Sequence, residues 1–196
     1  MSHGLLSDPR LYRALLLFDH DLAAESARGG CPCGGRLHRA DYPRKPRGGP
    51  GRLDPEYQRR PSFCCDRDGC RRRVTPPSVR FMGRRVYLAA VVVLVSAMRH
   101  GLTTPRVAEL TACFGVSART LARWRLWWRE TFVSTEVWKR VCGRLLPAPA
   151  VEGLPASWLA LLDDRHEAER VQWVLAWLLP LTTRTPGEGA GFVMGL

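Results

Sequence analysis

The spacing of apolar and polar residues predicts a mainly α-helical chain interrupted by one segment without helical periodicity. Apolar residues recur at helical spacing over residues 8–26, 86–98, 104–128 and 156–181, and a further helix is expected to begin near Ser134. Residues 31–85 are rich in Gly, Pro and Arg, which predicts loops and short strands. We therefore expect five parts: an N-terminal helix (1–30), a small basic β module (31–85), a three-helix unit (86–132), a C-terminal helical region (133–182) and a flexible tail (183–196).

The segment from Thr104 to Trp128 predicts two helices joined by a tight turn. Thr104 followed by Pro105 is a favourable helix start, and Gly115 can take the left-handed backbone that ends the first helix. Ser117 is placed to cap the second helix. The inward positions would be Val107, Leu110, Thr111, Phe114, Val116, Leu121, Trp124 and Trp128. Ahead of them, the apolar run from Val86 to Met98 is about thirteen residues long, too short for a bilayer, which needs about twenty. It predicts a buried first helix.

This spacing of core residues is typical of helix-turn-helix domains, although an ordinary helical hairpin remains the alternative. In the second helix Arg119 and Arg123 are one turn apart on the outer side, so they are candidates for the major groove of double-stranded DNA, together with Ser117 and Thr120. Arg106 in the first helix is a candidate phosphate contact.

The net charge of +12 is unevenly distributed and favours a polyanionic partner. Residues 31–85 hold fifteen basic and five acidic side chains, and residues 86–145 hold nine and three, whereas both ends are net negative. Lys45 and Lys139 are the only lysines, so the abundance of arginine reflects general usage, and only position can argue for a DNA contact. The basic stretch 42–60 is either an arm that follows phosphates or a solvated loop.

The cysteines number seven, which is odd, and five of them cluster between residues 31 and 70, which favours metal binding over disulfides. Two turns, around Cys31-Pro32-Cys33 and around Cys65 to Cys70, can each supply two thiolates to a tetrahedral Zn²⁺ ion. We expect the ligands to be Cys31, Cys33, Cys65 and Cys70. Cys64 competes with Cys65, because adjacent strand residues point to opposite faces. His38 is a weaker candidate that we expect at the surface, and Cys113 and Cys142 are expected in the core.

The order of these features resembles the DNA-binding region of insertion-sequence transposases. In that family a zinc ribbon runs into a basic strand, a turn with an aromatic residue, and then a helix-turn-helix, which matches the run from Arg71 to Phe81 and the predicted helices after it. The resemblance implies that both parts bind the end sequences of a mobile element, with phosphate contacts from Arg71, Arg72 and Arg73. It also implies a recombinase or transposase as a partner.

The sequence predicts a binding protein rather than an enzyme. The family's catalytic domain has no room here, and the acids Asp163, Asp164, Glu167 and Glu169, near His166, are explained by a helix start. The N-terminal residues lack a secretory leader, so a cytoplasmic, nucleoid-associated protein without a membrane span is expected. Tryptophans of the last third could form a homodimer interface. Two alternatives stay open: a stand-alone transcriptional regulator, and a zinc-containing adaptor that binds RNA or an acidic protein.

Overall fold

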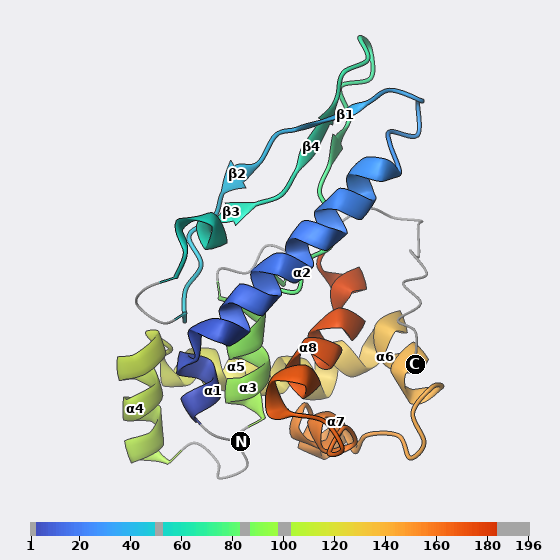
Figure 1. The fold of residues 1–196 in the computed structure, drawn as a ribbon. Helices are drawn as coiled ribbons and strands as arrows, with labels where there is room; N and C mark the ends of the chain where they lie inside the picture. Colours follow the sequence, from blue (N-terminus) through green and yellow to red (C-terminus); the bar gives the residue numbers. More distant parts are fainter. Residues whose placement is uncertain (1–2, 50–52, 83–86, 98–102, 184–196) are drawn as a thin grey trace.

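The computed structural model describes residues 3–49, 53–82, 87–97 and 103–183, the side chain of Arg106 excepted (Figure 1). The chain is mainly helical with small sheets, as predicted. The α-helices are α1 (His3–Ser7), α2 (Pro9–Arg28), α3 (Ala89–Ser96), α4 (Thr104–Phe114), α5 (Ala118–Leu126), α6 (Glu136–Cys142), α7 (Ala156–Ala160) and α8 (Glu167–Trp177). The strands are β1 (Leu37–Arg39), β2 (Tyr42–Pro43), β3 (Arg59–Arg60), β4 (Phe63–Cys65) and β5 (Arg73–Val74). The short turns of helix are η1 (Pro55–Gln58), the π-helical η2 (Trp127–Thr131), η3 (Phe132–Ser134), η4 (Val151–Gly153) and η5 (Leu179–Leu181).

Helix α2 runs along the molecule and connects its two ends. Its start is fixed by Asp8, whose carboxylate accepts the Arg10 backbone N–H, and by Pro9 in the first turn. Its apolar face is buried through Leu11, Leu15 and Leu22, as expected from the sequence. Twenty residues span about 30 Å. The first turns of α2 lie at the end of the molecule that holds α4, and its last turn lies at the end that holds β1 and β4 (Figure 1).

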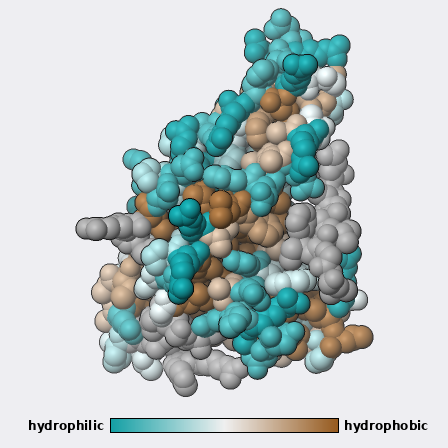
Figure 2. Space-filling view, in the orientation of Figure 1, coloured by the Kyte–Doolittle hydropathy of each residue, from teal (hydrophilic) through white to brown (hydrophobic). Residues whose placement is uncertain are grey.

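The strands form two small antiparallel sheets. One has the order β1-β4-β5, with Leu37 opposite Cys65 and Phe63 opposite Val74. The other pairs β2 with β3, Tyr42 opposite Arg60. The end of the molecule at β1 and β4 is mostly hydrophilic on the face drawn in Figure 2, whereas apolar atoms gather nearer its middle.

One cluster of buried apolar side chains runs through the helical body, from Leu6 to Leu179. Helix α3 lies inside it, because all eight of its residues are buried, and it packs on α5 and α8. The prediction of a buried first helix is confirmed, with α3 shorter than the apolar run; Val86 and Met98 lie outside the described residues. The rings of Phe132 and Trp158 stack at 5.8 Å and extend the cluster toward α7.

The predicted long helix over 156–181 is broken into α7, α8 and η5. His166 has an extended backbone just before α8, and the Arg170 guanidinium donates to the backbone oxygen of Asp163 at 3.0 Å, which fixes the intervening turn. Glu167 and Glu169 lie in the first turn of α8, so these acids do mark a helix start. Among the described residues, no helix is both long enough and apolar enough to cross a bilayer.

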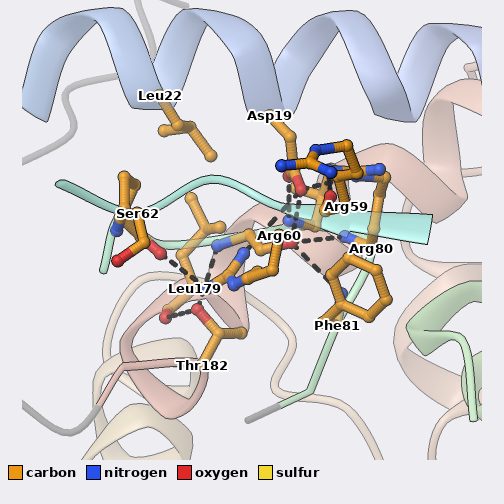
Figure 3. A network of polar contacts seen from close by, with 12 residues as sticks. Asp19, Leu22, Arg59, Arg60, Ser62, Arg80, Phe81, Leu179 and Thr182 are labelled. Carbon is orange, nitrogen blue, oxygen red and sulfur yellow. Dashed lines mark hydrogen bonds and ion pairs between the residues drawn. The ribbon is translucent and has the colours of Figure 1, made fainter. Parts of the chain in front are cut away.

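A buried polar network fastens the segment between the sheets and α3 to the middle of α2 (Figure 3). The side chains of Asp19 and Arg80 are fully buried, and the Arg80 Nε donates to Asp19 Oδ2 at 2.7 Å. The Val79 backbone N–H donates to the other carboxylate oxygen at 2.8 Å, and Arg60 lies 3.8 Å from Asp19. The 42–60 stretch is therefore anchored at its β3 end and is not a free loop there. Residues 50–52 lie outside the described residues, and the expected phosphate contacts of the stretch stay a prediction.

Candidate metal centre and helix-turn-helix surface

The four predicted ligands come together at the β1–β4 end of the molecule. The sulfur atoms of Cys31, Cys33, Cys65 and Cys70 all lie within 4.8 Å of one another. Cys31 Sγ is 3.7 Å from Cys70 Sγ, and Cys33 Sγ is 3.5 Å from Cys65 Sγ. Each of the two turns thus contributes two sulfurs, and the four cysteines can hold a metal ion.

The first turn is shaped by its glycines. The Gly34 N–H donates to the Cys31 carbonyl at 2.8 Å, and Gly34 has a φ of 81°, in the region that favours glycine. Gly35 is required for a different reason. A Cβ at this position would stand 2.5 Å from Cys65 Sγ and 3.0 Å from Asp66 Oδ1, so a side chain would fill the space that the sulfurs occupy.

The second turn is closed by the Cys70 N–H, which donates to the Arg67 carbonyl at 3.1 Å. The Arg67 N–H points at Cys65 Sγ over 3.4 Å, and the Arg67 guanidinium donates to the Cys33 carbonyl, which ties the second turn to the first. Backbone N–H groups directed at sulfur stabilise a thiolate. The turns therefore present the sulfurs in a form suited to a cation.

The charges of the four sulfurs are interdependent. The Gly35 backbone N–H, followed by hydrogen bonds from the neighbouring thiols, lowers the pKa of Cys33 to about 6. The pKa of Cys65 rises to about 12: the Arg67 N–H acts to lower it, but burial and the neighbouring thiols outweigh that effect. Several thiolates this close repel one another, and a bound cation removes that penalty. A set of four cysteines without carboxylate or hydroxyl ligands suits soft or borderline metals such as Zn²⁺.

Cys64 and His38 are excluded from the cluster by the strand register. They stand opposite each other on β4 and β1, one residue from the pair Leu37 and Cys65. The Cys64 sulfur contacts the Arg71 carbonyl at 3.6 Å, and His38 is an exposed side chain 3.4 Å from Asp66. The sequence prediction of Cys65 as the ligand and His38 as a surface residue agrees with this geometry.

At the other end of the molecule, α4 and α5 form the expected pair of helices. Gly115 has a φ of 62° and ends α4, as predicted. The Ser117 hydroxyl accepts the Thr120 backbone N–H at 3.3 Å and caps α5. The buried face contains Leu110, Phe114, Val116, Leu121, Trp124 and Trp128.

Two side chains depart from their predicted places. Thr120 was expected to face the groove with the arginines, but only 6% of it is exposed, and its hydroxyl lies 3.1 Å from Ser117 Oγ. Its position three residues after the cap turns it inward, so the prediction for Thr120 is wrong. Thr111 was expected inside but is exposed, and its hydroxyl oxygen lies 2.8 Å from two backbone carbonyl oxygens that can accept its one hydrogen, those of Val107 and Val116.

The outer face of α5 is open. Arg119 and Arg123 are exposed, as are Ala118, Ala122 and Leu126 between and beside them. Arg123 makes one long contact, 3.4 Å from its Nη2 to Thr120 Oγ1. Small residues flanking two arginines one turn apart leave room for a base edge or a phosphate to approach both.

The other arginines that were predicted to contact DNA phosphates lie away from the outer face of α5. Arg71, Arg72 and Arg73 are exposed beside the metal cluster, at the opposite end of α2 from the helix pair. Arg71 pairs with exposed Asp68 at 3.4 Å, and Arg73 lies over the Tyr42 ring at 6.0 Å. The side chain of Arg106 lies outside the described part of the chain.

The two cysteines predicted in the core differ from each other. Cys142 is half-buried against the core cluster, but Cys113 is exposed on the outer side of α4, which corrects that prediction. Cys113 directly precedes the buried Phe114 and follows the exposed Ala112, so the apolar face of α4 turns away from it.

Sequence reasoning missed Tyr87, which contacts α5 from outside the helix pair. The Tyr87 ring packs edge-on against the Trp124 ring at 5.0 Å, and its hydroxyl lies 3.5 Å from the Gly115 carbonyl oxygen. An aromatic residue at the end of a basic, irregular segment gave a weak signal of this role.

Comparisons of the chain with models of known families, with curated proteins and with solved structures found no match.

Proposed function

We propose that this chain is a zinc-stabilised protein that binds double-stranded DNA with sequence preference, and that α5 enters the major groove. The observation that carries the proposal is the open face of α5, where Arg119 and Arg123 project one turn apart while the opposite face is fully packed. Arginine can donate two hydrogen bonds to the edge of guanine, which makes it a common reader of sequence. Ser117 stands at the helix start, where a backbone N–H and a hydroxyl favour a phosphate.

Zn²⁺ is the metal that we assign to the four cysteines, because four thiolates in two tight turns are a common structural zinc set. In this proposal the ion has a structural role. It holds β1, β4 and β5 together, and these strands present Arg71, Arg72 and Arg73 as non-specific phosphate contacts.

A role at the ends of a mobile element, in association with a recombinase or transposase, is supported by the resemblance to transposase DNA-binding regions. The proposal assigns binding, and no catalytic step, to this chain.

The test is a binding titration with the full, metal-loaded chain. We would measure affinity for a duplex, a single strand and an RNA of equal length at several salt concentrations, with the zinc content determined by mass spectrometry. The expected result is one zinc per chain and a preference for the duplex. Equal or tighter binding to the RNA, without duplex preference, would replace the proposal with the adaptor alternative.

A further inference from the structure

The basic segment Arg44–Arg47 is held beside the helix-turn-helix through Tyr87. Arg47 forms a parallel β-bridge with Tyr87, and the Leu88 N–H donates to the Arg47 carbonyl at 3.0 Å. Tyr87 in turn contacts Trp124 of α5 and lies 3.5 Å from the Gly115 carbonyl of the turn. The contact of Arg47 with Tyr87 and that of Tyr87 with Trp124 therefore connect this segment to α5, which carries Arg119 and Arg123.

The backbone after Arg47 is pressed onto α3, which fixes the segment further. Gly48 is buried with a φ of 86°, and a Cβ there would lie 3.1 Å from Val91 Cγ1. At Gly49 a Cβ would lie 2.6 Å from Leu53 Cδ1. The left-handed backbone at position 48 favours glycine, so the close contact with α3 depends on Gly48, whereas a Cβ at position 49 would crowd the side chains of Leu53 and Leu88.

The start of the segment is also anchored. The Arg44 N–H donates to the Gln58 carbonyl at 2.6 Å, and the Arg44 guanidinium lies over the Phe81 ring at 5.6 Å. Pro43 and Pro46 restrict the backbone on both sides of Lys45. The segment is thus a fixed projection rather than a free arm.

Lys45 and Arg47 are the two basic side chains that this projection leaves exposed. Among the described residues, neither forms an ion pair or a side-chain hydrogen bond. Two unpaired cations beside a helix-turn-helix are suited to phosphate, since the affinity of a protein for DNA rests largely on neutralised phosphates.

We infer that Arg44–Arg47 is a wing: when α5 lies in the major groove, Lys45 and Arg47 bind backbone phosphates beside that groove. In Figure 1 the segment lies next to the end of α4 that leads into the turn, on the same side of the molecule. The inference rests on the proposed function. It adds a DNA contact distinct from the arginines at the metal cluster, which lie at the other end of α2.

The test compares two double variants of the full chain. K45A/R47A removes the wing cations, and K139A/R140A is the matched control, because it also removes one lysine and one arginine, both exposed on α6. A duplex motif is first selected with the unaltered protein. Affinity for the motif and for a scrambled duplex is then measured against salt, and phosphate ethylation interference maps the contacts.

We expect K45A/R47A to weaken binding to both duplexes by roughly tenfold and to reduce the salt slope by about two, since each phosphate contact contributes about 0.9. Interference should disappear at phosphates beside the motif and persist elsewhere. The control should keep the slope and the interference pattern. Thermal unfolding of both variants verifies the fold, and K45Q/R47Q repeats the test if the alanine variant is destabilised.

The outcomes separate the two claims. If the unaltered protein selects no motif, the proposed function fails. If it selects a motif and K45A/R47A behaves like K139A/R140A, the wing is overturned while the proposed function stands.

Discussion

At the residue scale, Gly35 determines whether four sulfurs can share one small volume. The backbone of the first turn passes so close to Cys65 that any side chain at position 35 would meet its sulfur at 2.5 Å. The same backbone supplies the N–H that lowers the pKa of Cys33 to about 6. One residue thus provides both the space and part of the electrostatic stabilisation of the cluster.

Replacing Gly35 with alanine should therefore weaken metal binding. The added methyl group displaces Cys65 Sγ, so we expect less than one equivalent of zinc after dialysis against a mild chelator. Gly29→Ala is the control, because Gly29 has a φ of −63° and a Cβ there would approach no atom closer than 3.6 Å. Mass spectrometry measures the zinc content of both variants, and Gly29→Ala should retain its full equivalent. Full retention of zinc by Gly35→Ala would refute the packing argument.

Arg119 on α5 and Arg72 beside the cysteine cluster should affect DNA binding differently. Arg119→Ala should relax preference at one base pair, at a cost of about 1–3 kcal/mol for the preferred sequence. Arg72→Ala should weaken all sequences equally and reduce the salt slope by about one. Competition titrations on matched and mismatched duplexes measure both effects. Equal loss of specific and non-specific binding in the two variants would contradict these roles.

The set of four cysteines that cluster could be predicted from sequence, because ligand chemistry and tight turns leave a local signature. The buried Arg60 and Arg80 could not, since a buried arginine and a surface arginine look alike in a basic segment. What distinguishes them is Asp19, which lies far away in sequence on α2. Thr120 shows the reverse error: its helical position suggested the outer face, but capping by Ser117 draws it inward.

At the element scale, the sheet β1-β4-β5 differs from the helices in how it is held. The core cluster that packs the helices contains no residue of these three strands. The buried groups at this end are chiefly Cys31, Cys65 and Phe63. A metal held by the four cysteines would therefore supply cohesion that a hydrophobic core supplies elsewhere.

Removing the metal should unfold this sheet and spare the helices. With a strong chelator we expect residues 31–39 and 63–74 to become sensitive to protease, while far-UV circular dichroism keeps most of its helical signal. Residues 57–60 and 78–82 should resist longer, because the Asp19 network holds them to α2. Unchanged protease resistance of the sheet after complete metal removal would count against a structural metal.

The bounds of α4 and α5 were the part of the fold that the sequence predicted best. Gly115 and Ser117 mark the end of α4 and the start of α5 by local backbone chemistry, so no distant residue is needed to place them. The break between α7 and α8 was not predicted. It depends on Arg170 reaching back to Asp163, an interaction that apolar periodicity does not register.

At the scale of the whole molecule, the Asp19 network joins segments that are far apart in the sequence. Asp19 lies in the middle of α2, and its partners come from β3 and from the segment that precedes α3. The Ser78 N–H also donates to Thr182 Oγ1 at 3.1 Å, which adds the C-terminal region (Figure 3). Strand β3, the segment before α3 and the C-terminal region are thus tied together at the middle of α2.

Asp19→Ala should be strongly destabilising. It leaves the fully buried Arg80 without its carboxylate, and breaking a buried ion pair costs about 3–5 kcal/mol. Asp21→Ala is the control, since it removes an exposed carboxylate from the same helix. Denaturant unfolding of the metal-loaded proteins gives the change in the free energy of unfolding for both variants. A cost for Asp19→Ala as small as that of Asp21→Ala would show that the network does not stabilise the fold.

The central claim, that this molecule reads duplex DNA through α5, is tested most directly by selecting bound duplexes from a random pool at physiological salt. The account predicts one enriched motif for the zinc-loaded protein, and loss of preference at one position of that motif when Arg119 is replaced by alanine. A pool that stays random after repeated rounds with fully zinc-loaded, folded protein would contradict it.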